Sequence, residues 1–260
     1  MKKFVLSAVA LSISMSSFAN CRETAIHRSL NDKSYGWQKV QEPVRLGKYS
    51  QRFELRAGDC GAQPEWSDCA TDRERSEVSA NKIIPVGTTQ YIKFSLFLEK
   101  DFQTSNRVGS VLGQVHQQGG PEGTTRGLPS KPPMFMFYLK GNSYDFCWQR
   151  PIVKNESLIS KCEFYNLLSV DQMKGQWNDI LLEMNTDSTK GYAKVFVNGE
   201  LKVEINEPLY YVQPRSYFFK YGIYNAFVSK HKGPMPTQVA YFDEVQLADS
   251  LDGLCKREID

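Results

Sequence analysis

Apolar and polar residues alternate with a period of two in many short segments of this 260-residue chain, and no other feature restricts its fold as much. Residues 91–99 are an example, because Ile, Phe or Leu occupies every second position and the positions between are mostly polar. Such alternation is typical of a β-strand with one buried face. Residues 192–197 and 200–205 are expected to pair as a hairpin, since Asn198-Gly199 between them suits a type I′ turn. No segment of useful length has a helical period.

The other expected strands follow one another at short spacing: residues 51–56, 72–78, 111–117, 134–139, 144–148, 161–165, 178–184, 217–225 and 238–247. We expect a short helix or turn at residues 169–175, and a long Gly- and Pro-rich loop at residues 117–133. Many short strands with almost no helix between them favour an all-β fold in which two antiparallel sheets pack as a sandwich.

Residues 1–19 have the parts of a secretory signal peptide. They start with Lys2 and Lys3, continue with a short apolar stretch, and end with a small residue, Ala19, after which we expect cleavage. The apolar stretch is too short for a stable membrane span. We therefore expect residues 20–260 to be exported as a single domain, to the periplasm or out of the cell.

The charge of the expected mature chain is almost balanced. The whole chain has 32 Lys and Arg and 29 Asp and Glu, so 30 basic side chains face 29 acidic ones once Lys2 and Lys3 are removed. A chain without a basic field is a poor candidate for binding nucleic acid. An anionic ligand would need a local basic cleft instead.

Six cysteines remain after the expected cleavage, and an even number in an exported protein indicates disulfides. Of the many possible pairings we favour Cys60–Cys69 and Cys147–Cys162, which are close in sequence, with Cys21–Cys255 joining the two ends. No Cys-x-x-Cys pair exists and His is scarce, so a zinc site is not expected. We expect no cofactor, and we leave a structural calcium ion open.

Three of the expected strands carry polar side chains suited to chemistry. In residues 111–117, Gln114 and His116 point to one face, because side chains two positions apart share a face of a strand. The structural alternative is a buried His whose hydrogen bond is satisfied by a Gln.

The second such strand, residues 72–78, places Arg73, Arg75 and Glu77 on one face. Two arginines in register form a good carboxylate receptor, because a guanidinium group binds a planar anion with two hydrogen bonds. The structural alternative is a solvated surface strand.

The third strand, residues 217–225, has one apolar face and a second face with Lys220, Gly222 and Tyr224. A glycine in mid-strand packs weakly but lets another chain come close to the backbone. For Tyr224 alone, packing on the surface of the sheet is the structural alternative.

These strands together resemble the polysaccharide lyases that have a concanavalin A-like β-jelly roll. Alginate lyases carry Arg-(Ser/Thr)-Glu, Gln-(Ile/Val)-His and Tyr-Phe-Lys-x-Gly-x-Tyr-Asn strands. The similar motifs here are Arg75-Ser76-Glu77, Gln114-Val115-His116 and Tyr217-Phe218-Phe219-Lys220-Tyr221-Gly222-Ile223-Tyr224-Asn225, the last with one extra aromatic residue.

A wider pattern resembles the heparin lyases and glucuronan lyases more closely. Its parts are Asp72 to Glu77, Gly175 to Asp179, Val197 to Gly199 and Lys220 to Tyr224. The resemblance covers roughly residues 50–248 and implies one antiparallel two-sheet β-jelly roll. Ser79 and Ala226 stand where alginate lyases often have Arg and Gln, which disfavours alginate as the substrate.

The resemblance implies that the protein is a lyase for an anionic, uronate-containing polysaccharide. Such a lyase removes the proton on C5 of a uronate and expels O4 of the neighbouring sugar, which leaves an unsaturated uronate. His116 would be the base, and Tyr224 would be the acid or both base and acid. Gln114 and Arg75 would neutralise the carboxylate. The other residues expected to contact the polymer are Arg73, Glu77, Lys220, Arg126 and Asn225. We expect a monomer.

Two other functions fit a β-jelly roll. A lectin-like protein would bind carbohydrate through aromatic and polar groups but would need no His–Tyr pair. A glycoside hydrolase would need two carboxylates on either side of the bond, typically as Glu-x-Asp-x-x-Glu on one strand, and the chain lacks that pattern.

Overall fold

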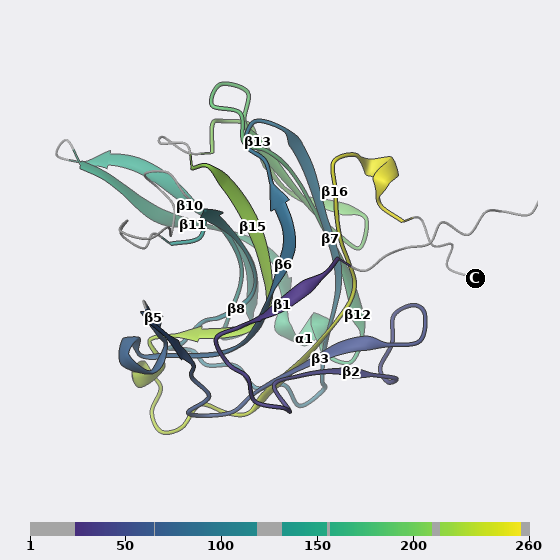
Figure 1. The fold of residues 1–260 in the computed structure, drawn as a ribbon, viewed down its shortest axis with the longest axis vertical. Helices are drawn as coiled ribbons and strands as arrows, with labels where there is room; N and C mark the ends of the chain where they lie inside the picture. Colours follow the sequence, from purple (N-terminus) through teal and green to yellow (C-terminus); the bar gives the residue numbers. More distant parts are fainter. Residues whose placement is uncertain (1–23, 65, 119–131, 155–156, 210–213, 256–260) are drawn as a thin grey trace, which may run out of the picture.

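The computed structural model describes residues 24–64, 66–118, 132–154, 157–209 and 214–255 (Figure 1). The expected signal peptide, residues 1–19, lies outside these ranges, so its cleavage and the single exported domain stay predictions. Within these ranges no helix has the length and apolar character that a membrane span requires.

Two seven-stranded antiparallel sheets lie face to face. The first, called the site sheet below, has the order β1 (Ile26–Ser29), β6 (Arg73–Ile84), β15 (Ser216–Ala226), β8 (Ser110–Gln118), β9 (Phe135–Lys140), β10 (Ser143–Lys154) and β11 (Ser157–Ser169). The second, called the back sheet, has the order β14 (Glu200–Ile205), β13 (Tyr192–Val197), β12 (Trp177–Asn185), β7 (Thr89–Leu98), β16 (Gln238–Ala248), β3 (Ser50–Leu55) and β2 (Trp37–Val40). Strands β4 (Ala62–Gln63) and β5 (Trp66–Ser67) form a small third sheet.

Helices are few and short among the described residues. The expected one is α1 (Val170–Met173), where Ser169 and Gln172 form a capping box at the N-terminus. Single 3-10 turns follow at η1 (Cys69–Thr71), η2 (Val228–Lys230) and η3 (Leu251–Gly253). The β13–β14 hairpin turns as expected, because Asn198 and Gly199 both have positive φ, 50° and 81°.

Aromatic side chains fill the space between the two sheets. Phe94 of the back sheet lies 5.1 Å from Phe137 and 5.8 Å from Phe219 of the site sheet, measured between ring centroids. Phe53 and Phe242 extend this cluster along the back sheet, 5.3 Å apart. Alternate residues of each strand thus make the core, as the period-two alternation predicts, and the other residues face outward.

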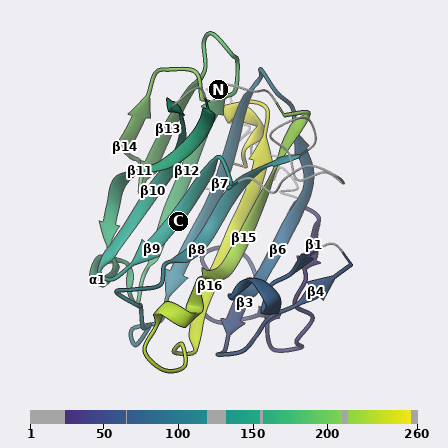
Figure 2. The same cartoon turned by 90° about the vertical axis from the view of Figure 1, so that its left-hand side faces the viewer.

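The strands of the site sheet bend, so that the outer surface of this sheet is concave (Figure 1). Figure 2 looks onto this surface and shows β6, β15, β8 and β9 side by side across its middle. The middle of this face is therefore formed by several neighbouring strands.

The all-β, two-sheet antiparallel jelly roll is confirmed, and the expected strands are all present. Several are longer than expected: β6 continues to Ile84, and β10 and β11 pair over their whole length, from Ser143↔Ser169 to Lys154↔Ser157. Cross-strand pairing extends these strands beyond the segments that alternation marks, because ladder hydrogen bonds do not require an apolar face.

Two of the three expected disulfides are confirmed, Cys60–Cys69 and Cys147–Cys162. The third, Cys21–Cys255, includes a residue outside the described ranges and stays a prediction. Among the described cysteines none is free.

Gly222 lets β15 and β6 come together. Its φ is 131°, and a Cβ atom built on it would lie 2.4 Å from the carbonyl oxygen of Ser76 and 2.8 Å from the Cα atom of Glu77. Both contacts are with backbone atoms, which cannot move aside as a flexible side chain does. The close approach expected for a mid-strand glycine is confirmed.

We predict that Gly222→Ala lowers the free energy of unfolding more than Gly199→Ala, by about 1–3 kcal/mol. Both glycines have positive φ, but a Cβ atom on Gly199 meets nothing within 4 Å, so this matched control reports the strain without the clash. Urea unfolding followed by circular dichroism measures both variants. Equal losses would show that the strands have room for a side chain at position 222.

Candidate active site

Three neighbouring strands bring the expected site residues to the outer face of the site sheet. Lys220 of β15 lies opposite Gln114 of β8, and Tyr224 of β15 lies opposite Arg75 of β6. Glu77 lies opposite Gly222. Val115 is fully buried in the core between the sheets, as the alternation predicts for a neighbour of two outward side chains.

The carboxylate of Glu77 is the centre of this cluster. Its Oε2 lies 2.5 Å from Nζ of Lys220 and accepts a 2.9 Å hydrogen bond from Nη1 of Arg75, while its Oε1 accepts a hydrogen bond from Nε2 of Gln114. Burial raises the pKa of Glu77, but the nearby charges of Lys220 and Arg75 outweigh burial, and the pKa lies below its usual value. Glu77 is therefore an ionised carboxylate that three donors from three strands hold in place.

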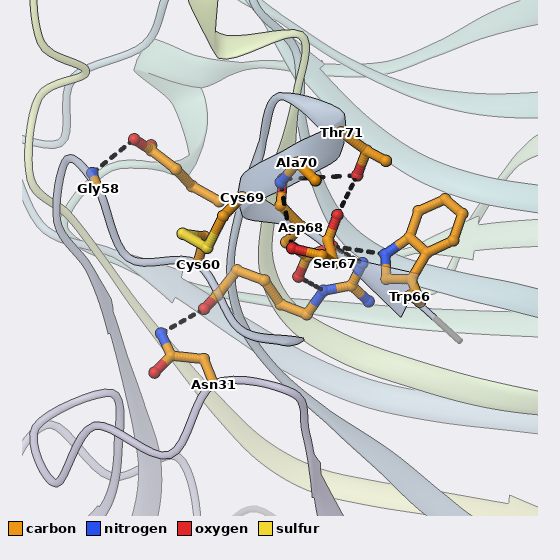
Figure 3. The surroundings of a disulfide bond; sticks show 11 residues. Asn31, Gly58, Cys60, Trp66, Ser67, Asp68, Cys69, Ala70 and Thr71 are labelled. Atoms are coloured by element: carbon orange, nitrogen blue, oxygen red, sulfur yellow. Dashed lines mark hydrogen bonds and ion pairs between the residues drawn. A yellow bond between two sulfur atoms is a disulfide. The ribbon is translucent and has the colours of Figure 1, made fainter. Parts of the chain in front are cut away.

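Arg75 is bound on its other side by Asp68. Figure 3 shows Asp68 in the loop that the Cys60–Cys69 disulfide closes. Nε and Nη2 of Arg75 donate to the two oxygens of Asp68 at 2.7 and 2.9 Å. Asp68 is fully buried and also accepts a 2.9 Å hydrogen bond from the indole nitrogen of Trp66. Burial lowers the pKa of Arg75, but the negative charges of Glu77 and Asp68 raise it by more. The net pKa lies above its usual value, so the guanidinium stays charged.

Backbone hydrogen bonds fasten the same loop to the start of β6. The amide of Arg73 donates to the carbonyl of Asp68, and the amide of Arg75 donates to the carbonyl of Asp59, both at 2.9 Å. Within the loop, the amide of Asp68 donates to the carbonyl of Gly61 at 2.9 Å. Asp68 was not among the expected site residues. Its signal in the sequence is its position beside Cys69, in a disulfide loop a few residues before two arginines that need counter-charges.

These contacts change the expected role of Arg75. The guanidinium was expected to receive the substrate carboxylate, but three of its N–H groups already bind the carboxylates of Asp68 and Glu77. Arg75 instead lies beneath the ring of Tyr224, with its Cζ atom 4.3 Å from the ring centroid.

Tyr224 is held from a second side by Arg73. Nε of Arg73 donates a 2.7 Å hydrogen bond to the Tyr224 hydroxyl. The Arg73 guanidinium lies over the rings of Trp66 and Phe227, with its Cζ atom 5.2 Å from each centroid. Burial raises the pKa of the Tyr224 hydroxyl, and Arg75 and Arg73 offset part of this increase. The phenol is therefore protonated at neutral pH and still able to donate its proton.

His116 stands at the other end of the cluster, opposite Phe218. Its ring stacks on Phe218 with 5.5 Å between centroids, and its Nδ1 lies 3.1 Å from the carbonyl oxygen of Gln117. A carbonyl can only accept, so Nδ1 carries the proton and Nε2 has a free lone pair. Burial, with the charge of Lys220, lowers the pKa of His116 to about 4, so the imidazole is neutral at ordinary pH.

His116 and Tyr224 share one electrostatic environment. The charges of Arg75 and Glu77 act on the pKa of both residues. Along the face, the order is His116, then Gln114 with Lys220, then Glu77, and finally Arg75 with Tyr224, as the pairing register sets it.

Asn225 does not join the cluster, which corrects its expected contact with the polymer. Its side chain is fully buried on the core face, where its Oδ1 accepts from Ser110 at 2.6 Å and its Nδ2 donates to Gln238 at 2.9 Å. A residue next to an outward side chain on a strand must point inward. Arg126, the remaining expected contact, lies outside the described residues.

The charges of the cluster nearly cancel. Asp68 and Glu77 balance Arg75 and Lys220. Within the described part of the chain, the guanidinium of Arg73 donates hydrogen bonds only to the Tyr224 hydroxyl and the Thr71 carbonyl. Among the described residues of the cluster, Arg73 is thus the cation that is in no ion pair. No group of three His, Cys, Asp or Glu side chains suited to a metal occurs among the described residues.

Comparison with solved structures gives the same fold in lyases. The endo-β-1,4-glucuronan lyase from the fungus Trichoderma reesei superposes with a TM-score of 0.62 at 18% sequence identity, over 90% of this chain and 98% of that one. The alginate lyases from Corynebacterium sp. and Klebsiella pneumoniae give TM-scores of 0.52 and 0.53 at 15% and 10% identity. They cover 86% and 82% of this chain, and 94% and 85% of their own. A comparison with curated proteins gives no match.

The family itself is identified from the sequence. The model of the polysaccharide lyase family matches residues 16–246, which is most of the chain. The chain therefore belongs to the polysaccharide lyase family, and it is an enzyme that acts on a polysaccharide.

Proposed function

We propose that this lyase cleaves a uronate-containing anionic polysaccharide by β-elimination on the concave face of the site sheet. The observation that carries the proposal is the state of Tyr224: its hydroxyl accepts from Arg73 and its ring lies on Arg75, next to the buried carboxylate of Glu77. A phenol so placed keeps its own proton available for a departing oxygen.

In the proposed reaction the C5–H bond of the uronate and the C4–O4 bond break. The proton from C5 goes to a base, the electron pair of the C5–H bond becomes the C4=C5 double bond, and O4 leaves with a proton from an acid. The C5 proton is poorly acidic while the neighbouring carboxylate is ionised. Groups that bind this carboxylate therefore stabilise the charge that develops during the reaction.

His116 is the proposed base and Tyr224 the proposed acid. The low pKa of His116 keeps the imidazole neutral, with its one proton on Nδ1. Nε2 therefore has a free lone pair that can accept a proton, as a base requires. In a variation that uses one residue for both steps, Tyr224 would first lose its own proton to solvent, and the phenolate would take the proton from C5 and give it to O4. In that case His116 and Gln114 would bind the uronate.

Arg73 is the proposed partner of the substrate carboxylate. The charges of Arg75 and Lys220 are taken up by Asp68 and Glu77, which leaves Arg73 as the cation able to attract an anionic sugar. Gln114 can add a neutral hydrogen bond from the next strand. Arg73 thus takes the role that was expected of Arg75, two positions later on the same strand.

Glucuronan is the proposed first choice of substrate. The Trichoderma reesei protein named as a glucuronan lyase shares this fold over nearly its whole length, and Ser79 and Ala226 depart from the alginate-lyase pattern. The basic start and short apolar stretch of residues 1–19 support export, so that the enzyme would meet its polymer outside the cytoplasm.

We predict that the protein releases unsaturated uronates from glucuronan, and that His116→Ala and Tyr224→Phe each lower kcat about 10²–10⁴-fold. Ultraviolet absorbance of the C4=C5 double bond measures the product, with alginate and heparin-like chains as parallel substrates. Tyr192→Phe, a change of an outer tyrosine on the back sheet, is the matched control. Activity that survives in Tyr224→Phe would remove Tyr224 from the reaction.

We predict that kcat/KM falls only below about pH 4, because His116 must stay unprotonated to act as a base. The chain has three histidines, so NMR can follow the His116 ring directly, with His116→Asn for assignment. Lys220→Met removes a charge that lowers this pKa and should move both the ring titration and the acid limb to higher pH, whereas Lys202→Met on the back sheet should not. A ring that titrates near 6.5 in the parent protein would contradict the assignment.

We predict that Asp68→Asn moves the alkaline limb of kcat/KM to lower pH by about one unit. The loss of this negative charge leaves Arg75 less compensated, so Tyr224 loses its proton more easily. Asp145→Asn, which removes an acid bonded to Ser143 on the same sheet, is the control. Circular dichroism checks the fold, because a buried ion pair that loses one partner is destabilised. An alkaline limb that stays in place would show that Asp68 does not act on Tyr224.

A further inference from the structure

An aromatic pair lies on the same concave face, away from the charged cluster. Phe164 of β11 is 52% exposed, which is unusual for a large apolar side chain, and its ring lies 5.4 Å from that of Tyr138 of β9. Tyr138 lies between the core residues Phe137 and Leu139, and Phe164 precedes Tyr165, which packs against the core, so both rings point outward from the site sheet.

The pairing register places this pair in line with the proposed active site. Gln114 lies opposite Met136, Met136 opposite Cys147, and Cys147 opposite Phe164. Phe164 is thus three strands away from Gln114, or about 14 Å at the usual spacing of strands. Tyr138 lies opposite Val111, whose other neighbour is Tyr224.

Two features fix the rings in this place. The Cys147–Cys162 disulfide joins β10 to β11 directly beside Phe164. Beneath Tyr138 lies Gly109, where a Cβ atom would come within 1.9 Å of the Tyr138 ring, so the ring rests on bare backbone. The disulfide therefore fixes the backbone beside Phe164, and the close approach of Gly109 makes room for the ring of Tyr138.

We propose that Tyr138 and Phe164 bind a sugar ring of the same polymer about three units from the bond that is cleaved. A pyranose unit in an extended chain is about as long as the spacing between strands, about 5 Å, so a polymer that crosses the strands advances one sugar per strand. The C–H face of a pyranose is apolar and packs well on aromatic rings. This proposal rests on the proposed function, because it assumes that cleavage occurs at the charged cluster.

The chemistry of this second site differs from that of the first. The acid next to it, Asp145, is bonded to Ser143 and Asn166, and no Lys or Arg is paired with the two rings in the described structure. The platform would therefore hold a sugar by its ring and not by its carboxylate. Its contribution should depend little on salt, in contrast to that of Arg73.

The test compares long and short substrates in Phe164→Ala. We expect kcat/KM for glucuronan polymer to fall roughly 3- to 10-fold, equally at low and high salt, with no change for glucuronan di- and trisaccharides that end before the platform. Phe164→Trp keeps a ring and should retain activity on the polymer. Leu201→Ala, at an apolar side chain that is 44% exposed on the back sheet, is the control for loss of surface area.

Binding separates failure of this proposal from failure of the proposed function. Calorimetry with Tyr224→Phe and glucuronan oligosaccharides of increasing length should show a gain in affinity once the chain reaches the platform, and this gain should vanish in Tyr224→Phe/Phe164→Ala. If no polyuronate gives an unsaturated product, the proposed function is overturned, and the binding measurement still tests the platform. Equal losses on long and short substrates, or no length-dependent gain in affinity, would overturn the platform alone.

Discussion

The buried carboxylate of Glu77 is the interaction on which the rest of this face depends. A charge taken out of water is costly unless its oxygens are fully bound, and the loss of one partner typically costs about 3–5 kcal/mol. Glu77 avoids this cost with donors from its own strand and from each of the next two, Arg75, Lys220 and Gln114. The same bonds fix the positions of those side chains relative to one another. One carboxylate thus sets both the ionisation and the spacing of the cluster.

The arrangement leaves little net charge on the cluster around Glu77. Two acids offset two of its three bases, and the third, Arg73, lies against two aromatic rings. An aromatic setting suits the proposed role of Arg73 in binding the substrate carboxylate, because rings attract a guanidinium without occupying its N–H groups. Under the proposed function, Arg73 would meet the anionic polymer with one charge, and the remaining contacts would be uncharged ones across the strands.

The sequence predicts the fold well because the period of two is a local property that the sheet preserves. It also places Gln114, His116, Arg75 and Tyr224 on one face, since each parity argument holds within its own strand. The same argument excludes Asn225, which is next to Tyr224 and has to point inward. Asp68 is different: its distance to Arg75 depends on how an irregular loop folds back on β6, and no periodicity describes that path. For the same reason, the sequence does not show that the N–H groups of Arg75 are already bound by Asp68.

The Cys60–Cys69 loop holds Asp68 by a different kind of bond from the one that holds the strands together. Strands β6, β15 and β8 are joined by backbone ladders, whereas the second counter-charge of Arg75 sits in a segment closed by a covalent bond between two sulfur atoms. Denaturants act on the first kind of bond and thiols on the second. A thiol that opens the Cys60–Cys69 bond therefore acts on the loop that carries Asp68, whereas the ladders that join β6, β15 and β8 contain no disulfide.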